Sequence, residues 1–299
     1  MRNVPEAHTI YAFEPEMQPA LTIEPPQTVV FETLDALGGQ VRETGDTVDA
    51  LDFSRVNPAT GPVAVDGARP GDALAVEIHA VELPHQGAII AGPGMGVLGD
   101  LIERPVARIL PIEDGDVRFG DLRIPVSPMV GVIGVAPEEG SHPTGTAHRH
   151  GGNMDAREIG PRATVYLPVF RPGALLALGD VHAVMGDGEV CVSACEVSAV
   201  VTTHVRVLES RAPRWPVVET DDAIILLVSL PTIEEALREA THEAVRALER
   251  VLSLPFEDAY LLASLTVDIG VSQLVDPNKT AKAVLPKRLV GPFEAWPAS

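Results

Sequence analysis

The chain is poor in cysteine, and its two cysteines, Cys191 and Cys195, lie close together in the stretch EVCVSACEV. The β-branched residues around them predict a strand. Four residues along a strand span about 13 Å, which is beyond the reach of a disulfide bond. We therefore expect two free thiols on one face of a strand, packed as small hydrophobic side chains, and we do not expect a cysteine nucleophile.

Basic residues and long apolar runs are also scarce. There are 22 Lys and Arg against 42 Asp and Glu, which gives a formal net charge of −20. Such a surface repels phosphate backbones and anionic membranes, so neither nucleic acid nor a membrane is expected as a partner, whereas a neutral small molecule or a cation is not repelled. No run approaches the roughly 20 apolar residues of a membrane helix, and the N-terminus lacks the apolar segment of a signal peptide. We therefore expect a cytoplasmic protein.

Short strands separated by tight turns dominate the first 230 residues. The chain has 26 Gly and 27 Pro, and 45% of its residues are hydrophobic. Segments rich in Val, Ile and Leu alternate with turn sequences such as NPATGP and EDGD, which favours a sandwich or barrel over alternating βαβ units. The predicted strands are at 8–13, 28–33, 73–83, 107–113, 129–136, 164–170, 174–180 and 191–197. The predicted fold class is mainly β (β-sandwich or barrel-like, α+β).

Helical patterns appear only near the C-terminus. Thr232 and Glu235 have the spacing of a capping box, and apolar residues recur at helical spacing from Ile233 to about Leu254, where Pro255 ends the pattern. A second helix is predicted over 257–265. With no repeat and no linker, we expect one domain over 1–299, β-rich over 1–230 and helical or mixed over 231–299, with a C-terminal helical layer.

The densest polar cluster in apolar surroundings lies at 175–190, LLALGDVHAVMGDGEV. Asp180 and His182 are two residues apart and share a face if the segment is a strand. A turn at 186–188 contains Asp187, and Glu189 is predicted to begin the next strand. One histidine and three carboxylates are costly to bury unless a cation such as zinc neutralises them. The alternative is a turn shaped by Asp187 and a hydrogen-bonded core histidine.

A second cluster, AHRHGGNMD, lies at 147–155. His148 and His150 share a face if the segment is extended, and Gly151 and Gly152 let the backbone approach a ligand closely. Asn153 can donate to or accept from an amide, and Asp155 adds a carboxylate. The alternative is a glycine turn with exposed histidines. The first cluster favours the interpretation that both contribute to one site.

These segments resemble the acetamidase/formamidase family. HGGNMD at 150–155 and GDVHAVMGDGEV at 179–190 are similar to its two signature segments. The similarity extends through 31–39, 57–78, 258–276 and 285–287, in collinear order over nearly the whole chain. The resemblance implies hydrolysis of short carboxamides such as formamide or acetamide, a β-rich fold with C-terminal helices, a bound divalent metal, and a homodimer or higher homo-oligomer. Met185 departs from the family pattern, which commonly has Gln there.

From the residue types in the matching segments we assign roles to the candidate residues. Asp180, His182, Asp155 and Asp35 are expected to hold the metal, which we expect to be Zn²⁺, with Ca²⁺ as a possible second ion. Glu189 or Asp187 is expected to act as the base, and Asn153 with the 151–152 backbone to orient the amide. Glu196 is a reserve ligand or base, and Asp268 a further candidate for a buried carboxylate. A metal-dependent hydrolase of cyclic or larger amides and a non-catalytic metal- or ligand-binding protein remain alternatives.

Overall fold

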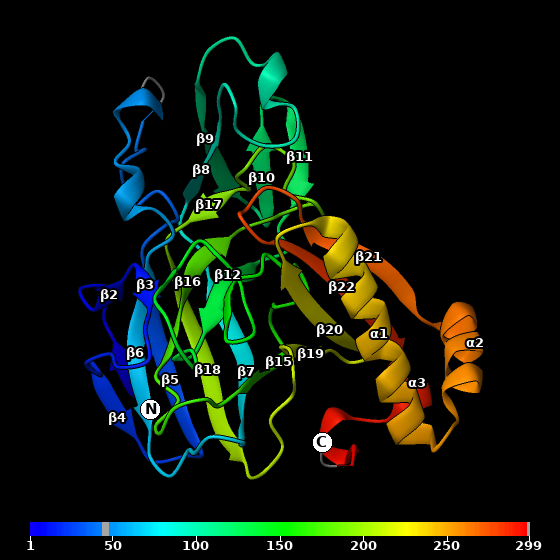
Figure 1. The fold of residues 1–299 in the computed structure, drawn as a ribbon. Coiled ribbons are helices and arrows are strands. Elements are labelled where there is room, and N and C mark those ends of the chain that lie inside the picture. Colours follow the sequence, from blue (N-terminus) through cyan, green and yellow to red (C-terminus); the bar gives the residue numbers. More distant parts are fainter. Residues whose placement is uncertain (44–47, 298–299) are drawn as a thin grey trace.

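The computed structural model describes residues 1–43 and 48–297, which form a mainly β structure with helices near the C-terminus (Figure 1). One sheet has nine strands in the order β1-β5-β18-β7-β15-β19-β20-β22-β21. In that order the strands are Arg2–Val4, Gln27–Thr33, Ala199–Leu208, Ala73–Glu82, Thr164–Pro168, Val217–Glu219, Ala223–Leu230, Lys279–Pro286 and Asp268–Gln273. The predicted fold class, mainly β with a C-terminal helical layer, is confirmed.

A second sheet has eleven strands within the described residues and runs along β11-β10-β9-β8-β17-β16-β12-β14, with β6 paired to β16, β2 and β4. Its strands are β2 (Thr9–Ile10), β4 (Leu21–Ile23), β6 (Ala59–Val65), β8 (Gln86–Ala91), β9 (Val106–Glu113), β10 (Asp116–Phe119), β11 (Leu122–Pro125), β12 (Met129–Gly134), β14 (Gly151–Asn153), β16 (Leu176–His182) and β17 (Glu196–Val197). A separate two-stranded sheet joins β3 (Ala12–Phe13) to β13 (His142–Pro143).

Side chains from the two large sheets form one buried hydrophobic cluster. Phe31 and Leu74 enter it from the nine-stranded sheet, and Ile133, Leu176 and Leu178 from the other, all with their side chains fully buried. Every residue of β12 and β16 is buried, so both faces of these strands are covered by protein. Polar side chains on β16 therefore enter an environment from which water is excluded.

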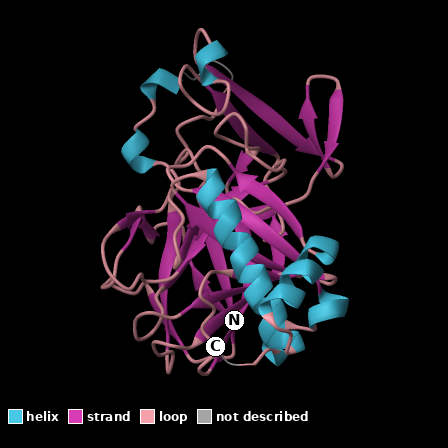
Figure 2. Ribbon diagram, turned by 45° about the vertical axis from the view of Figure 1, so that its right-hand side comes forward, coloured by secondary structure: helices cyan, strands magenta, loops and turns pink. Residues whose placement is uncertain are grey.

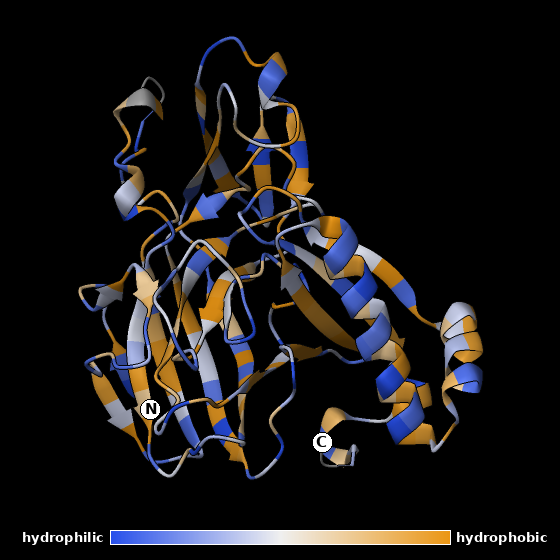
Figure 3. Ribbon diagram, viewed as in Figure 1, coloured by the Kyte–Doolittle hydropathy of each residue, from blue (hydrophilic) through white to orange (hydrophobic). Residues whose placement is uncertain are grey.

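The helical layer covers β20 and β22. It consists of α1 (Ile233–Leu252), α2 (Phe256–Thr266) and α3 (Lys287–Val290), and Figure 2 shows α1 and α2 together at one side of the strands. Thr232 caps α1 by accepting a hydrogen bond from the Glu235 amide, as its position before Ile233 predicts. Ala236, Ala240, Ala244 and Leu248 form the buried face of α1, and in Figure 3 this helix alternates hydrophobic and hydrophilic bands. The spacing of apolar residues therefore predicted both longer helices to within two residues of their ends.

Two of the predicted strands differ from those in the structure. The segment 8–13 is divided between β2 and β3, which belong to different sheets. The segment 191–197 is a turn up to Cys195, and only Glu196–Val197 is a strand. The expectation that the cysteines share a strand face was therefore wrong, although both are free thiols. Val192, like Glu189, has a positive φ (+82° and +47°), and this backbone conformation prevents a continuous strand.

Short 3₁₀ helices occur at Val48–Ala50, Phe53–Arg55, Gly99–Leu101 and Phe293–Ala295. Across residues 1–43 and 48–297, none of the helices combines the length and apolar character needed to span a bilayer.

Candidate active site

Strand β16 carries Asp180 and His182 into the protein interior. The two side chains point the same way, with His182 Nε2 3.2 Å from Asp180 Oδ1, as their spacing predicts. Asp180 is 1% exposed and His182 is fully buried. Asp180 has a φ of +53° at the point where the ladder between β16 and β12 skips Gly131. The irregularity coincides with an acidic side chain on a strand that is apolar except for Asp180 and His182.

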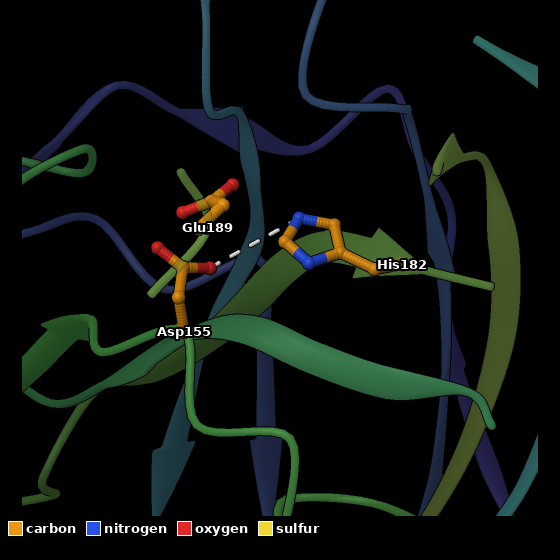
Figure 4. A group of neighbouring side chains, drawn as sticks. All are labelled: Asp155, His182 and Glu189. Carbon is orange, nitrogen blue, oxygen red and sulfur yellow. Dashed lines mark ion pairs between the residues drawn. The ribbon is translucent and has the colours of Figure 1, made fainter. Parts of the chain in front are cut away.

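Three further carboxylates surround His182: Asp155 precedes β16 in the chain, and Glu189 and Glu196 follow it. Asp155 Oδ1 lies 4.0 Å from Nε2, and Glu196 Oε2 lies 3.1 Å from it. Figure 4 shows Asp155, His182 and Glu189 pointing toward one another. Ligand atoms of Asp155, His182 and Glu189 lie within 4.8 Å of one another, and so do those of Asp180, His182 and Glu196. The two overlapping sets share His182 and are called the acidic cluster below.

A sixth residue, Asp276, joins this site from the turn after β21. Its Oδ2 accepts a 2.9 Å hydrogen bond from Asn153 Nδ2. This bond fixes the amide of Asn153, whose Oδ1 is buried and has no hydrogen-bond partner among the described residues. Asp268 was the carboxylate of this region that we expected to be buried, but its side chain is exposed. The DPN turn that holds Asp276 was the available signal, because Asp is common where a strand gives way to a turn.

Burial and mutual repulsion control the protonation of the acidic cluster. Burial, together with the neighbouring carboxylates, raises the pKa of Asp155 and Glu189 well above the usual values. Burial likewise raises the pKa of Glu196, and burial with the charges of Glu189 and Asp180 raises that of Asp276 well above its usual value. For His182 burial lowers the pKa, but Glu196 and Asp180 outweigh it and hold the pKa well above the usual value. These carboxylates therefore cannot all be ionised without a compensating positive charge.

The residues of the acidic cluster fit a divalent cation. Both carboxylate oxygens of Asp155 and the Nδ1 atom of His182 are buried and find no hydrogen-bond partner within the described part of the chain. An unpaired buried carboxylate is costly, and a metal ion would supply the missing partner. One imidazole nitrogen with carboxylate oxygens is a donor set that zinc accepts. These buried groups could therefore hold a metal ion.

A glycine makes room for the carboxylates. A Cβ atom on Gly131 would lie 2.4 Å from Asp155 Oδ1 and 3.0 Å from Asp180 Oδ2. Because no side chain can occupy that position without moving the carboxylates, Gly131 of β12 forms part of the floor of the site.

Two predicted site residues lie outside the acidic cluster. Within the described residues Asp35 belongs to neither ligand set; its Oδ1 accepts hydrogen bonds from the amides of Leu37 and Gly39, 3.0 Å each. Asp187 is also in neither set, and its Oδ1 instead lies 2.7 Å from Lys282 Nζ and 3.3 Å from Arg157 Nε. Backbone amides thus already donate hydrogen bonds to the Asp35 carboxylate, and Lys282 and Arg157 already neutralise the charge of Asp187.

The turn that carries Asp187 and Glu189 is not the predicted hairpin. Gly188 bridges in parallel to Gln273, and its amide donates to the Ser272 carbonyl at 2.7 Å. Glu189 does not begin a strand; it turns inward and is 7% exposed. The end of β21 therefore fixes this loop through its backbone, and a long-range contact replaces the local pairing that the turn residues suggested.

The two glycines before Asn153 are buried in β14. Gly151 and Gly152 pair with Gly134 and Ile133 of β12 and have φ values of +95° and +101°. A Cβ on Gly151 would lie 2.2 Å from the Ile133 carbonyl oxygen. Close packing between backbones accounts for both glycines, and the expected contact of their backbone with a substrate stays a prediction.

The remaining sequence candidates lie apart from the acidic cluster. His148 and His150 do not form a strand face; their rings gather with that of His142 around a separate cavity.

Burial, reinforced by the charge of Glu196, raises the pKa of the Cys195 thiol to about 12. That thiol is protonated at neutral pH, in agreement with the expectation that it is not a nucleophile.

Comparison with known proteins assigns the family. The family model described as "Acetamidase/Formamidase family" matches residues 4–142 and 138–226. The chain belongs to the acetamidase/formamidase family.

The solved structures that resemble this protein cover nearly all of it. A predicted acetamidase/formamidase from the thermophile Thermoanaerobacter tengcongensis superimposes with a TM-score of 0.94 at 42% identity, covering 96% of each chain. An acetamidase from Bacillus halodurans has a TM-score of 0.95 at 39% identity, covering 97% of this chain and 100% of its own.

The curated relatives are longer than this chain. The formamidase of Methylophilus methylotrophus is 24% identical in an alignment of 238 residues, and the match covers 60% of this chain and 58% of that protein. The chain spans about three-fifths of the length of the two curated relatives it matches, 63% and 58%.

Proposed function

We propose that this protein hydrolyses the C–N bond of a small linear carboxamide, of the formamide or acetamide type, releasing ammonia and a carboxylate. The observation that carries the proposal is the acidic cluster, in which two sets of ligand atoms share His182 and neither oxygen of Asp155 has a hydrogen-bond partner among the described residues. Family membership supplies the reaction class, and the names of the relatives supply the amide substrate.

Asp155, Asp180 and His182, with Glu196, are the residues that would hold a divalent cation, which we propose to be Zn²⁺. Bound there, zinc supplies Lewis acidity that polarises a carbonyl oxygen. Calcium accepts oxygen ligands only, so as a second ion it would use the carboxylates.

Glu189 is the proposed general base. It is 7% exposed, and its pKa is raised well above the usual value, first by burial and then by the neighbouring charges. A carboxylate with a raised pKa can take a proton from the attacking water and return it to the departing amine near neutral pH. Asp187 is less suited to this role, because its carboxylate is paired with Lys282.

Asn153 is the proposed substrate-orienting residue. Its Nδ2 is committed to Asp276, which leaves Oδ1 as a buried acceptor with no partner among the described residues. A primary carboxamide carries two N–H donors, one of which can satisfy this oxygen. Met185, which packs with Met129 and Ala194, presents an apolar side chain where the family commonly has Gln, and this favours an apolar acyl group.

The test is a coupled ammonia assay on the purified protein with formamide, acetamide and propionamide, before and after chelation and after zinc is added back. We expect release that chelation abolishes and zinc restores. The His182→Ala variant should lose the metal of the acidic cluster and the activity, whereas His85→Ala, at an exposed position, should retain both.

Two other results would replace the proposal. Ring opening of a lactam without ammonia would indicate a hydrolase of cyclic amides. Stoichiometric metal without turnover of either substrate class would indicate a binding protein.

A further inference from the structure

Three histidines surround a cavity of about 520 Å³ that the proposed reaction does not use. His142 lies in β13, His148 bridges to Gly151, and His150 directly precedes β14. The ring centroids are 4.3 Å apart for His142 and His148, 5.1 Å for His142 and His150, and 5.9 Å for His148 and His150. We call this the histidine cavity.

One imidazole of the cavity has a ring nitrogen with no hydrogen-bond partner among the described residues. His150 is 2% exposed, and its Nε2 has no hydrogen-bond partner among those residues. Its ring leans on Phe13 with the centroids 5.1 Å apart, so the apolar side is already packed. A buried ring nitrogen without a hydrogen-bond partner lowers the stability of a folded protein. Its presence indicates that a ligand bound in the histidine cavity supplies the missing partner.

The partner of one other ring resembles that of a metal-binding histidine. His142 Nε2 lies 3.1 Å from the Glu139 carbonyl oxygen. If that nitrogen donates, Nδ1 keeps its lone pair for a metal, which is the usual arrangement of a metal-bound imidazole. The His148 ring has a different neighbour, because Asn278 Nδ2, a donor, lies 3.2 Å from its Nδ1 and donates to the Ala147 carbonyl. His148 therefore binds a metal only when its ring turns away from Asn278.

The size of the cluster matches a three-histidine site. A zinc–nitrogen bond of about 2.1 Å places the centre of each imidazole about 3.2 Å from the ion. Three rings arranged tetrahedrally around that ion then have centres about 5 Å apart, and the observed separations of 4.3 to 5.9 Å bracket this value. The nitrogens of the three rings do not all lie within 4.8 Å of one another in the structure. Metal binding therefore requires the rings of His142 and His148, which are both partly exposed, to turn their nitrogens toward a common point.

The charge of the surroundings also favours a cation. Two acidic residues and one basic residue, Glu138, Glu139 and Arg149, line the histidine cavity, in a chain with a formal net charge of −20. Burial, with the charge of His142, lowers the pKa of His148 to about 4 and that of His150 to about 3. Both rings are therefore neutral at physiological pH, which is the form that binds metals.

We propose that the histidine cavity binds one borderline divalent transition-metal ion, such as Zn²⁺, Co²⁺ or Ni²⁺, through His142, His148 and His150. This ion is additional to any ion held by the acidic cluster. Nitrogen-only donors select these metals over Ca²⁺ and Mg²⁺, which take oxygen ligands.

The test is a titration of the chelator-treated full-length protein with Zn²⁺, followed by Co²⁺ as a spectroscopic probe. To isolate the histidine cavity, the titration uses a His182→Gln background, in which the acidic cluster has lost its shared ligand. We expect one equivalent of zinc to bind in this background. Adding His142→Gln or His148→Gln should weaken that binding by about tenfold or more, while His85→Gln, at an exposed position, should not change it.

Both histidine substitutions replace partly exposed rings, and far-UV circular dichroism checks that each variant is folded. Zinc binding in the His182→Gln background that is unchanged by either histidine substitution would overturn the proposal. Absence of zinc binding in that background, with the protein folded, would overturn it equally.

Discussion

At the residue scale, the acidic cluster is built on unusual backbone conformations. Asp155, Asp180 and Glu189 have φ values of +43°, +53° and +47°. Each such residue costs about 1 kcal/mol or more, and persists only where the surrounding structure imposes it. Asp tolerates this region better than most residues do, whereas Glu has no special tolerance for it. Of the three, Glu189 therefore depends most on its surroundings.

Replacing Glu189 by Gln tests the proposed base. The substitution keeps size and hydrogen bonding but removes the ability to accept a proton. We expect kcat for formamide or acetamide to fall by about 10²- to 10⁴-fold with little change in KM, measured by ammonia release. Glu103→Gln, at an exposed position, is the matched control, and a Glu189→Gln enzyme with wild-type kcat would assign the base elsewhere.

Gly131→Ala tests the floor of the site. The new Cβ would lie 2.4 Å from Asp155 Oδ1, so the carboxylates must shift. We expect loss of bound metal and activity, with a fall of about 1–3 kcal/mol in the free energy of unfolding, measured by metal analysis and denaturant titration. Gly186→Ala is the control, because no atom lies within 4 Å of its added Cβ. Wild-type metal content in Gly131→Ala would contradict the geometry described.

At the scale of elements, strand β22 connects the two segments that carry Asp155 and Glu189. Lys282 Nζ lies 2.7 Å from Glu158 Oε1 and 2.7 Å from Asp187 Oδ1. Glu158 is three residues after Asp155, and Asp187 is two residues before Glu189. Lys282 lies opposite Gly270 of β21 in the ladder between β21 and β22. One buried ammonium thus holds both segments in register.

We therefore expect Lys282 to act as a positioning residue. In Lys282→Met, kcat should fall by about ten- to a hundredfold while KM changes much less, because a small displacement of catalytic groups is costly. Lys282→Arg should restore part of kcat. Lys287→Met is the matched control, since Lys287 is the first residue of α3, directly after β22, and pairs with Glu219 instead. A fall in stability without any change in kcat would show that the role is structural only.

At the scale of the whole molecule, the acidic cluster links stability to pH and metal. Three of its carboxyl groups, those of Asp155, Glu189 and Glu196, and that of the adjoining Asp276 have raised pKa values in the folded protein. A raised folded pKa means that this contribution to stability is fully present below the unfolded value, about 4. It is lost as pH rises above that value, unless a cation neutralises the charges.

Chelation should therefore destabilise the protein more at pH 8 than at pH 5. The melting temperature with and without chelator at each pH measures this difference. Asp155→Asn should reduce the difference between the two pH values, whereas Asp268→Asn, which alters an exposed carboxylate, should leave it unchanged. An equal fall in melting temperature on chelation at both pH values would contradict the coupling of metal to these carboxylates.

Much of the local structure was predictable because its causes are local. The capping box at Thr232 and the recurrence of apolar residues gave α1 and α2 nearly to their ends. The two-residue spacing of Asp180 and His182 placed both on one face of β16. The 186–188 turn failed as a hairpin because β21 supplies its hydrogen bonds from about 85 residues away, a contact that no local pattern encodes.

The mainly β class, the C-terminal helices, the family resemblance and the two segments with Asp155, Asp180, His182 and Glu189 could all be inferred from residue order. Which carboxylates meet depends on the folded arrangement. It brought in Glu196 and Asp276, gave Asp35 and Asp187 other partners, and separated the histidines at 148 and 150 from the acidic cluster. The physical reason is that a ligand set is defined by distance and burial. Both depend on how strands far apart in sequence pair and which faces they cover, whereas residue type and spacing report only on neighbours along the chain.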